Sequence, residues 1–369
     1  MSTLAPDISL PKLRRRLLAW FDSHCRDLPW RRDRDAYRIW VSEVMLQQTT
    51  VAAVIPYFER FLAAFPTVTD LAAADEQQVL KLWEGLGYYR RARHLHAAAK
   101  RLVSEYGGTL PDDPAVWAGL PGVGRYILGA VLSQAFDRRL PIVEANSSRV
   151  LCRLYGQDAD PAAPVVRRWL WERAEELLPK RRIGDFNQAL MELGALVCTP
   201  ANPDCGACPL TQACAARKAG LQAAIPRKTR APAPTMVREV AVVVRRGSRV
   251  LLVRRPEDAR RWQDMWEFPR GELEPGETYD AAAARLLAPL TGVSANIGPE
   301  LMTIRHGVTR FRITLVALEA EYRGGRFSSE FYTRGVWVRP KELDDYPVSA
   351  PQRRLASAVA ARSRQRRLF

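Results

Sequence analysis

The sequence predicts a two-domain protein in which an all-α domain is followed by an α+β domain. The 369-residue chain exceeds the usual size of one domain, so each part can bury its own core. Residues 11–225 carry alanine and leucine at three-to-four spacing, with turns at glycine or proline, which is typical of helices. Residues 226–236 are proline-rich and basic, as in a linker, and strand-like spacing follows. We therefore place the domains at 1–225 and 237–369.

The chain carries a formal net charge of +16. This charge favours a polyanionic partner, although an arginine-rich proteome would produce the same bias. No apolar run approaches the length of a bilayer span, so nucleic acid is a better candidate than a membrane. The N-terminal residues lack the apolar stretch of a secretion signal. We expect a monomer in the reducing cytoplasm, associated with the nucleoid if the source is bacterial.

The first helix is expected at about Pro11–His24, and a loop of arginines around one tryptophan follows it. The loop reads RDLPWRR from Arg26 to Arg32. Arginines that flank an aromatic ring can stack on a base and hydrogen-bond its edge. For this segment alone, a surface loop with one anchoring tryptophan is nearly as good an interpretation.

Glu43 lies in the apolar helical stretch from Ile39 to Thr50. A carboxyl group in apolar surroundings has a raised pKa and can hold a proton near neutral pH, as a general acid must. The alternative is a charged side chain that only faces solvent.

The turn Gly85–Arg93 reads GLGYYRRAR and combines glycine, aromatic and arginine residues. Such a turn can insert a ring into a duplex while its arginines hold phosphates. By itself the turn is a weak indication of DNA binding.

The pentapeptide LPGVG places Gly122 and Gly124 directly before the helical run that starts at Tyr126. Bare backbone N–H groups at a helix N-terminus form an anion site that suits a phosphate. An ordinary turn between two helices explains the pentapeptide alone equally well.

About twenty residues downstream, Glu144 and Asn146 stand at the start of the helix expected at Ser147–Tyr155. The positive end of the helix dipole favours an ionised carboxylate there, so we expect Glu144 to be charged. A simple N-terminal charge without a chemical role is the alternative. A phosphate site followed by a carboxylate fixed at a helix start indicates chemistry on a nucleic acid.

Four of the six cysteines lie in one loop with the spacing C-x6-C-x2-C-x5-C. They are Cys198, Cys205, Cys208 and Cys214. In a reducing compartment, clustered thiolates indicate a metal site. Zinc sites usually show two separated C-x2-C pairs, and the single pair here favours an iron-sulfur cluster held by four cysteines. The other two, Cys25 and Cys152, are expected to be buried core thiols.

Beyond the linker the sequence predicts strands with one helix between them. A hairpin of Val237–Val244 and Arg249–Val253 turns at Arg246–Ser248, and a helix is expected at Thr278–Leu290. Further strands are expected at Leu315–Ala320 and Val336–Val338, and a basic helix ends the chain. This mixture predicts the α+β class.

The helical part closely resembles the adenine DNA glycosylases of the MutY family, which belong to the helix-hairpin-helix superfamily. Five motifs and the four cysteines occur in family order. The motifs are RDLPWRR, WVSEVMLQQTTV, WEGLGYYRRAR, LPGVGRYILGAV and FNQALMELGALVCTP. The resemblance implies a base-excision-repair enzyme with a 4Fe-4S cluster. Its substrate would be double-stranded DNA in which adenine is mispaired with 8-oxoguanine or guanine, and the adenine would be flipped into a pocket.

The resemblance also implies roles for individual residues. Glu43 would be the general acid, and Glu144 would be the anionic group beside the sugar, supported by Tyr126 and Asn146. The base pocket would be lined by Arg26, Leu28, Trp30, Arg31 and Gln188. DNA contacts would come from Leu46, Gln48, Thr49, Leu86, Tyr88, Gly122 and Gly124. Of these, Gln48 and Tyr88 would be wedged into the base stack.

Two carboxyl groups suit the reaction that the family performs. Adenine leaves poorly as an anion, so the base must be protonated and an oxocarbenium-like sugar must be stabilised. This chain departs from the family in having Glu144-Ala145-Asn146 where Asp-Gly-Asn is usual, which lengthens the carboxylate arm by one methylene. The loop between Cys198 and Cys205 also lacks the basic residues often found there.

The second domain resembles Nudix folds. Gly271, Glu277 and Arg285 match the outer frame of the Nudix box, but apolar residues follow Arg285 where that box has metal-binding glutamates. Without these glutamates no magnesium site for pyrophosphate hydrolysis can form.

Recognition of the oxidised guanine is therefore the role expected of the second domain. The family has a Phe-Ser-His tip there, and this chain has Val308, Thr309 and Arg310. Thr309 keeps a hydroxyl group that can hydrogen-bond a base edge.

Three other functions are weaker interpretations. An endonuclease III-like glycosylase with lyase activity needs an amine nucleophile, and Tyr126 stands where that family has lysine. A nucleotide pyrophosphatase is opposed by the missing glutamates. A lesion-binding protein without catalysis is opposed by the presence of Glu43.

Overall fold

The computed structural model describes residues 9–227, 229 and 232–365. The chain divides into two compact units, Met1–Ala73 with His94–Arg230 and Ala74–Arg93 with Ala231–Phe369. The predicted linker lies partly outside the described residues, at positions 228, 230 and 231. Its last two residues, Thr235 and Met236, already belong to a strand. Among the described residues, no helix has the length and apolar character needed to cross a membrane.

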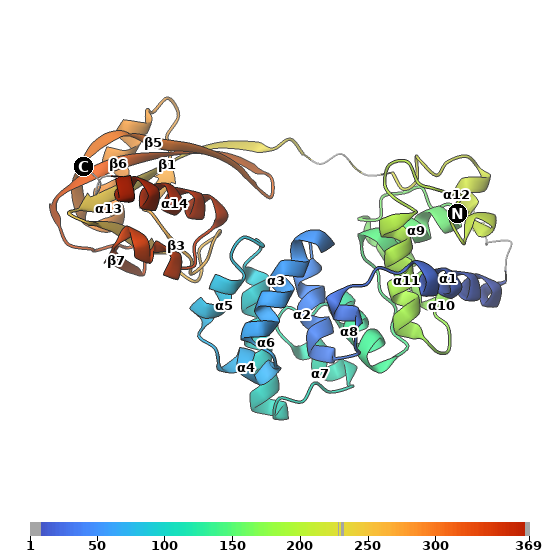
Figure 1. The fold of residues 1–369 in the computed structure, drawn as a ribbon. Coiled ribbons are helices and arrows are strands. Elements are labelled where there is room, and N and C mark those ends of the chain that lie inside the picture. Colours follow the sequence, from blue (N-terminus) through green and yellow to red (C-terminus); the bar gives the residue numbers. More distant parts are fainter. Residues whose placement is uncertain (1–8, 228, 230–231, 366–369) are drawn as a thin grey trace. The chain divides into compact units, whose positions relative to one another are not determined.

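The first unit is helical, as the sequence predicts (Figure 1). Its α-helices are α1 Leu10–His24, α2 Ala36–Leu46, α3 Val51–Ala64, α4 Val68–Ala73, α6 Arg90–Tyr106, α7 Pro114–Gly119, α8 Arg125–Phe136, α9 Ala145–Tyr155, α10 Pro164–Leu177, α11 Ile183–Leu196 and α12 Ala215–Lys218. Short 3₁₀ turns lie at η1 Pro29–Arg31 and η2 Thr211–Ala213. The first four residues of α6 belong to the second unit.

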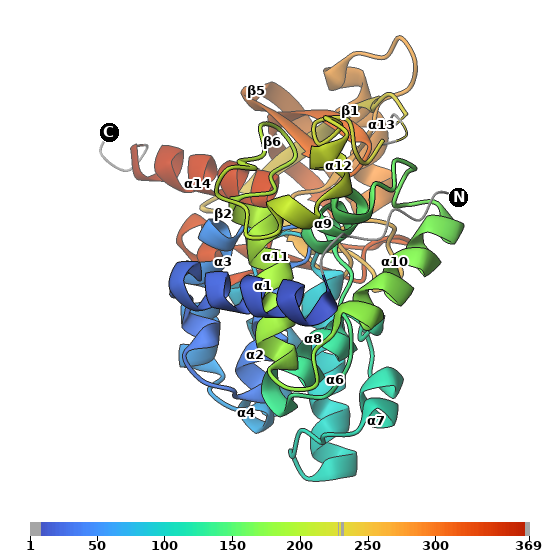
Figure 2. The same ribbon diagram turned by 90° about the vertical axis from the view of Figure 1, so that its right-hand side faces the viewer.

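Helix α11 is central to the packing of the first unit. It contacts α1, α8 and α9, and Figures 1 and 2 both show it beside α1. Gly194 permits the close approach to α9, because a Cβ atom there would lie 2.6 Å from the Cβ atom of Asn146. Leucines of α1 and α11, such as Leu13, Leu17 and Leu190, share one buried core.

The second unit is built on a seven-stranded mixed sheet with the order β3-β2-β1-β6-β5, in which β4 also pairs with β1 and β7 with β2. The strands are β1 Thr235–Arg246, β2 Arg249–Arg254, β3 Trp266–Glu267, β4 Arg270–Glu272, β5 Val293–Val308, β6 Phe311–Gly325 and β7 Arg334–Val338. Strands β1 and β6 pair in parallel, and β5 and β6 form a long antiparallel hairpin (Figure 1). The helices are α5 Glu76–Leu82, α13 Tyr279–Thr291 and α14 Ala350–Gln365, with a 3₁₀ turn η3 at Pro340–Asp345.

Each face of this sheet is covered by one helix. Ala241 and Val243 of β1 share a core with Leu355 of α14. Val242 and Val244, which alternate with them, share a second core with α13. This alternation follows from the two-residue period of a strand, and it explains why β1 is almost continuously apolar.

The predicted elements are present within a few residues, including the basic C-terminal helix, while the short strands β3 and β4 were not predicted and two further features differ. Strand β5 was not predicted, because Gly298 and Pro299 interrupt its pattern and the pairing with β6 is irregular between Ser294 and Met302. Cys152 is buried as expected, whereas the expectation of a buried Cys25 was wrong, since this residue caps the end of α1 and is exposed.

Candidate active site

Glu43 is a buried carboxyl group whose two oxygens accept hydrogen bonds from neutral donors. It lies on α2 with 3% of its surface exposed. The Tyr126 hydroxyl on α8 donates to Oε2 at 2.5 Å, and Gln134 Nε2 donates to Oε1 at 2.8 Å. Burial raises the pKa of Glu43, and the two hydrogen bonds and the charge of Arg31 only partly offset it. The group therefore suits a general acid, as the sequence predicts.

Tyr126 supports a different carboxylate from the one we expected. We expected it beside Glu144, but its hydroxyl donates to Glu43, 83 residues away in the chain. The pKa of Tyr126 is raised well above its usual value by burial and by the neighbouring carboxylate of Glu43. Its hydroxyl group therefore keeps its proton and remains a donor. Gln134, the second donor, was missed, although it lies in the apolar stretch that follows LPGVG.

Glu144 caps the N-terminus of α9, as its position before the helix predicts. Its carboxylate accepts hydrogen bonds from the backbone N–H groups of Asn146 at 2.7 Å and Ser147 at 2.6 Å. Asn146 thus supports Glu144 through its backbone, while its side-chain oxygen accepts a bond from Arg149. The helix N-terminus does not lower the pKa of Glu144 below its usual value. Burial raises the pKa of Glu144 by more than these bonds and Arg149 lower it, and the charge of Glu43 raises it further.

Arg26 and Arg31 of the predicted base pocket both pair with one buried carboxylate, Glu192 on α11. Arg26 Nε lies 2.7 Å from Oε1, and Arg31 Nη2 lies 2.9 Å from Oε2. Burial acts to raise the pKa of Glu192, but the hydrogen bonds from the two arginines outweigh it and hold the pKa at about 2. Glu192 was missed, although an acidic residue within the apolar helix FNQALMELGAL was an available signal.

The other predicted pocket residues come from the loop after α1 and from α11. Leu28 and Trp30 are buried, and the Trp30 ring stands edge-on to Phe58 at 5.3 Å between centroids. Gln188 is half-buried, and its Oε1 atom is shielded from solvent without a hydrogen-bond partner among the described residues. An unpaired buried amide oxygen is costly unless a ligand supplies a donor.

Both predicted wedge residues have left-handed backbone conformations, Gln48 at φ 59° and Tyr88 at φ 49°. Non-glycine residues rarely adopt this conformation, and it is found most often at functional sites. Gln48 and Tyr88 are exposed, and Leu46 and Thr49 are half-buried. Leu86, the other predicted DNA contact of this turn, is buried, with 7% of its surface exposed.

The LPGVG loop leads into α8, with Gly122 at φ 75° and Gly124 at the cap position. A side chain at Gly122 would collide with His94, since its Cβ would lie 2.5 Å from that of His94. Gly124 and Arg125 are exposed. No side chain in the described part of the chain caps α8, and its first turn contains no acidic residue. The backbone N–H groups of this turn are thus suited to a phosphate.

None of the four clustered cysteines forms a disulfide, and two of them contact Arg153 near the end of α9. Arg153 Nη1 donates to Cys198 Sγ at 3.3 Å, and the Cys214 thiol donates to the Arg153 carbonyl oxygen at 3.3 Å. Burial raises the pKa of Cys208 to about 12, and the three other thiols contribute to this rise. Across residues 9–227 and the rest of the described chain, no three His, Cys, Asp or Glu side chains are arranged to hold a metal ion.

Thr309 lies at the tip of the β5–β6 hairpin in the second unit. It is exposed, has a left-handed backbone at φ 49°, and donates its hydroxyl to the Val308 carbonyl oxygen at 2.7 Å. The hydroxyl oxygen can still accept a bond from outside.

Both parts of the chain match known families. Residues 41–176 match the "HhH-GPD superfamily base excision DNA repair protein" family, and residues 239–358 match the "NUDIX domain". The chain is 37% identical to the adenine DNA glycosylase of Rattus norvegicus over 366 residues, which cover 84% of this chain and 71% of that protein. The chain belongs to the adenine DNA glycosylase family. With the adenine DNA glycosylase of Homo sapiens it shares 36% identity over 395 residues, covering 89% and 72% of the two chains.

A solved structure supports the fold of the helical part. A thermostable thymine-DNA glycosylase superposes with a TM-score of 0.52 at 29% identity, covering 57% of this chain and 97% of that chain. The predicted architecture is therefore confirmed, with a helix-hairpin-helix part followed by a Nudix-like part.

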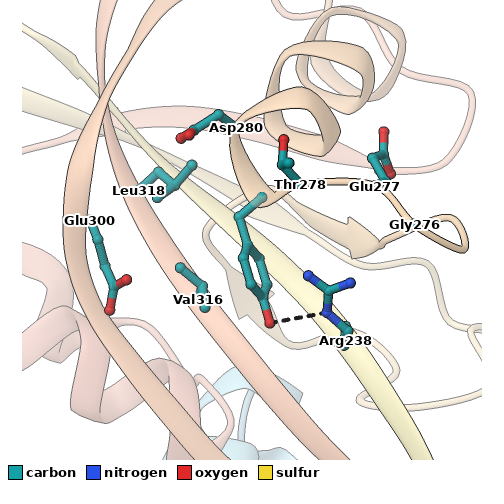
Figure 3. A pocket seen from close by; sticks show the side chains of 9 residues that line it. Arg238, Gly276, Glu277, Thr278, Asp280, Glu300, Val316 and Leu318 are labelled. Carbon is teal, nitrogen blue, oxygen red and sulfur yellow. Dashed lines mark hydrogen bonds between the residues drawn. The ribbon is translucent and has the colours of Figure 1, made fainter.

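The Nudix-like part of this adenine DNA glycosylase family member contains a pocket of about 460 Å³ (Figure 3). Glu300, Val316 and Leu318 from β5 and β6 face Thr278 and Asp280 at the start of α13. The remaining lining residues are Arg238, Gly276, Glu277 and Tyr279. None of the residues predicted to act on DNA lines this pocket.

The Nudix frame has a structural role in this chain. The Glu277 carboxylate accepts two hydrogen bonds from Arg285, at 2.8 and 2.7 Å. Leu286, which stands where the Nudix box has a metal ligand, packs against Gly271, and Leu287 is buried in the core under α13.

Proposed function

We propose that the protein hydrolyses the N-glycosidic bond of adenine mispaired with 8-oxoguanine or guanine in double-stranded DNA, acting as a monomer and without lyase activity. The observation that carries this proposal is the buried carboxyl group of Glu43, which has a neutral donor on each oxygen. A second, half-buried carboxyl group, Glu144, lies close enough for the charge of Glu43 to raise its pKa. Membership of the adenine DNA glycosylase family supports it.

The chemistry follows from the two carboxyl groups. Glu43 protonates the flipped adenine, the bond from the base to the sugar carbon breaks, and the neutral adenine leaves. The positive charge that develops on the sugar is stabilised by the Glu144 carboxylate, which two backbone N–H groups hold in place. A water molecule adds to the sugar carbon, and its proton passes to a carboxylate.

The pocket for the flipped base is proposed to lie between the loop Arg26–Arg31 and α11. Arg26 and Arg31 are fixed by Glu192, so they line the pocket as a rigid pair. The unpaired Oε1 atom of Gln188 is a candidate acceptor for the exocyclic amine of adenine.

We propose that Cys198, Cys205, Cys208 and Cys214 hold a 4Fe-4S cluster. The donor set suits such a cluster, because the four thiols form no disulfides and three of them pack against one buried core. Such a cluster would tie the loop after α11 together through four bonds to sulfur. Purified protein is expected to be yellow-brown, and a colourless, active preparation containing zinc would contradict this assignment.

We propose that 8-oxoguanine is recognised by the domain at 237–369 through Thr309, with residues 1–225 carrying the chemistry and 226–236 joining the two. Thr309→Ala should lower the preference for 8-oxoguanine over guanine opposite adenine by about tenfold, because one base-specific hydrogen bond is worth roughly 1–3 kcal/mol. A preference unchanged in this variant would remove Thr309 from lesion recognition.

The main experiment incubates the protein with a duplex that carries adenine opposite 8-oxoguanine, followed by alkali. Strand breaks that require the alkali are expected, without a covalent adduct after borohydride, since Tyr126 provides no amine. Breaks before alkali together with borohydride trapping would favour an endonuclease III-like lyase. Tight binding without any breaks would favour a lesion-binding protein.

A further inference from the structure

The turn that carries Tyr88 folds with the C-terminal part of the chain. Residues 74–93 form one compact unit with residues 231–369, although the sequence match to the helix-hairpin-helix family spans them. We call residues 83–89, which read WEGLGYY, the wedge turn.

An arginine of α14 binds Glu84, the acidic residue of the wedge turn, which also pairs with Lys81 at 3.1 Å. Arg353 donates from Nε and Nη2 to the two carboxylate oxygens of Glu84, the second at 3.0 Å. The pair is largely buried, with 20% of the Arg353 side chain and 10% of the Glu84 side chain exposed. Arg353 is itself fixed by the carbonyl oxygens of Leu343 and Tyr346, at 2.9 and 2.7 Å.

A second contact holds the other side of the turn. The Tyr89 hydroxyl donates to the Val348 carbonyl oxygen at 3.3 Å, and the Val348 N–H group donates to Glu84 at 3.4 Å. The residues on both sides of Gly85–Tyr88 are therefore bound to residues 346–353.

The turn between these two contacts has an unusual backbone, and its one non-glycine residue with a positive φ angle is Tyr88. Gly85, Gly87 and Tyr88 all have left-handed backbones, at φ 97°, 77° and 49°. A non-glycine residue keeps this conformation only when its surroundings impose it. The Tyr88 side chain is nevertheless 46% exposed, so the contacts fix the backbone and leave the ring accessible.

We propose that Arg353 is a positioning residue for Tyr88, so that the lesion-reading domain also holds the residue that is inserted into the base stack. The proposal rests on the wedge role that the family resemblance implies for Tyr88. It also means that deleting the C-terminal domain would disturb the wedge turn, so a truncation cannot report on lesion recognition alone.

The test uses Arg353→Ala, Tyr88→Ala and the double variant in the full-length protein. A duplex with 2-aminopurine beside 8-oxoguanine reports unstacking by stopped-flow fluorescence, and single-turnover excision is measured on the same duplex. Stacking of a base on an aromatic side chain is worth roughly 1–3 kcal/mol, so Tyr88→Ala should slow excision about tenfold and abolish the fluorescence rise. Arg353→Ala should reproduce most of both losses and add less than about twofold in the Tyr88→Ala background.

Two further variants make the result decisive. Glu84→Gln keeps the shape of the side chain and removes its charge. It should therefore reduce the fluorescence rise and excision as Arg353→Ala does, and it can replace Arg353→Ala if the arginine variant folds poorly. Arg362→Ala is the matched control, because Arg362 lies on the same helix and pairs with Glu319 at 3.3 Å, away from the wedge turn.

The outcomes separate this inference from the proposed function. If Tyr88→Ala is impaired while Arg353→Ala and Glu84→Gln behave like Arg362→Ala, the positioning role is refuted. Losses that add up in the double variant would also refute it. If Tyr88→Ala itself has no effect on fluorescence or excision, the proposed wedge role fails, and the inference fails with it.

Discussion

Glu43 in the helical unit and Glu267 in the sheet unit are buried to nearly the same extent, and their pKa values shift in opposite directions. They are 3% and 1% exposed. Glu43 accepts hydrogen bonds from Tyr126 and Gln134, which are neutral, and burial raises its pKa. For Glu267, burial acts in the same direction, but the charges of Arg270 and Arg255 outweigh it and lower the pKa.

The partners therefore decide what a buried carboxyl group can do. With neutral donors it can hold a proton and deliver it, and with arginines it stays ionised and acts as a structural anchor. Glu192 is a second example of the anchored kind, with a pKa of about 2 between Arg26 and Arg31. Burial alone would not have separated Glu43, the carboxyl group proposed as the acid, from the structural ones.

The largest effect is expected from removing the acidic proton of Glu43, the buried carboxyl group with neutral partners. Glu43→Gln keeps the shape of the side chain and removes the proton that is delivered to adenine, so base release should fall by up to about 10⁴-fold. DNA binding measured by gel shift should remain. Appreciable single-turnover excision by this variant would mean that Glu43 is not the acid.

Removing the charge of Glu267, the buried carboxyl group with arginine partners, should lower the stability of the fold. Glu267→Gln leaves the buried Arg255 without its carboxylate and leaves Arg270 with Glu239 alone as counter-charge, and breaking a buried ion pair typically costs about 3–5 kcal/mol in the free energy of unfolding. Urea denaturation above pH 4.5 measures it. Because the pKa of Glu267 is lowered by folding, its stabilisation is present above that pH and is lost as the pH falls.

The control for this prediction is Glu274→Gln. Glu274 has a largely exposed side chain whose pairing with Arg285 is long, at 3.7 Å. Its replacement should leave the unfolding transition nearly unchanged. If both variants lost the same free energy of unfolding, the buried ion pairs of Glu267 would contribute no more stability than an exposed pair.

Variants of Glu144 test whether the reaction needs a carboxylate beside the sugar. Glu144→Gln keeps the length of the side chain and loses its charge, so excision should fall by about 100-fold or more. Glu144→Asp restores the family's residue and should be mild or even favourable. Single-turnover rates on one duplex compare the two variants, and wild-type activity in Glu144→Gln would remove Glu144 from the mechanism.

The smallest expected effect concerns the hydrogen bond from Gln134. This bond favours the ionised form of Glu43, so Gln134→Leu should raise the pKa of that group further. A general acid works in its protonated form, so the rate falls as the pH rises through its pKa. The fall should therefore come at higher pH in the variant, with less than a tenfold change in the maximal rate. A shift to lower pH would contradict the assignment.

Local features of the molecule could be predicted from the sequence. The cap at Glu144, the cysteine loop and helix α13 depend on residues that are neighbours along the chain, so their spacing is sufficient information. The family motifs added the prediction that Glu43 is the acid. The exposed Cys25 and the irregular strand β5 were missed, because one depends on where a helix ends and the other on its partner strand.

The sequence by itself thus determined the order of the two folds and the cap at Glu144, and it predicted which carboxyl group is the acid and which loop holds a cluster. Only the tertiary structure decided that the Tyr126 hydroxyl donates to Glu43, that Glu192 binds two arginines, and that burial raises the pKa of Glu144. It alone joined the wedge turn to α14 through Glu84 and Arg353, 269 residues apart. These features depend on partners distant in sequence and on how much water each group loses, and spacing along the chain carries neither quantity.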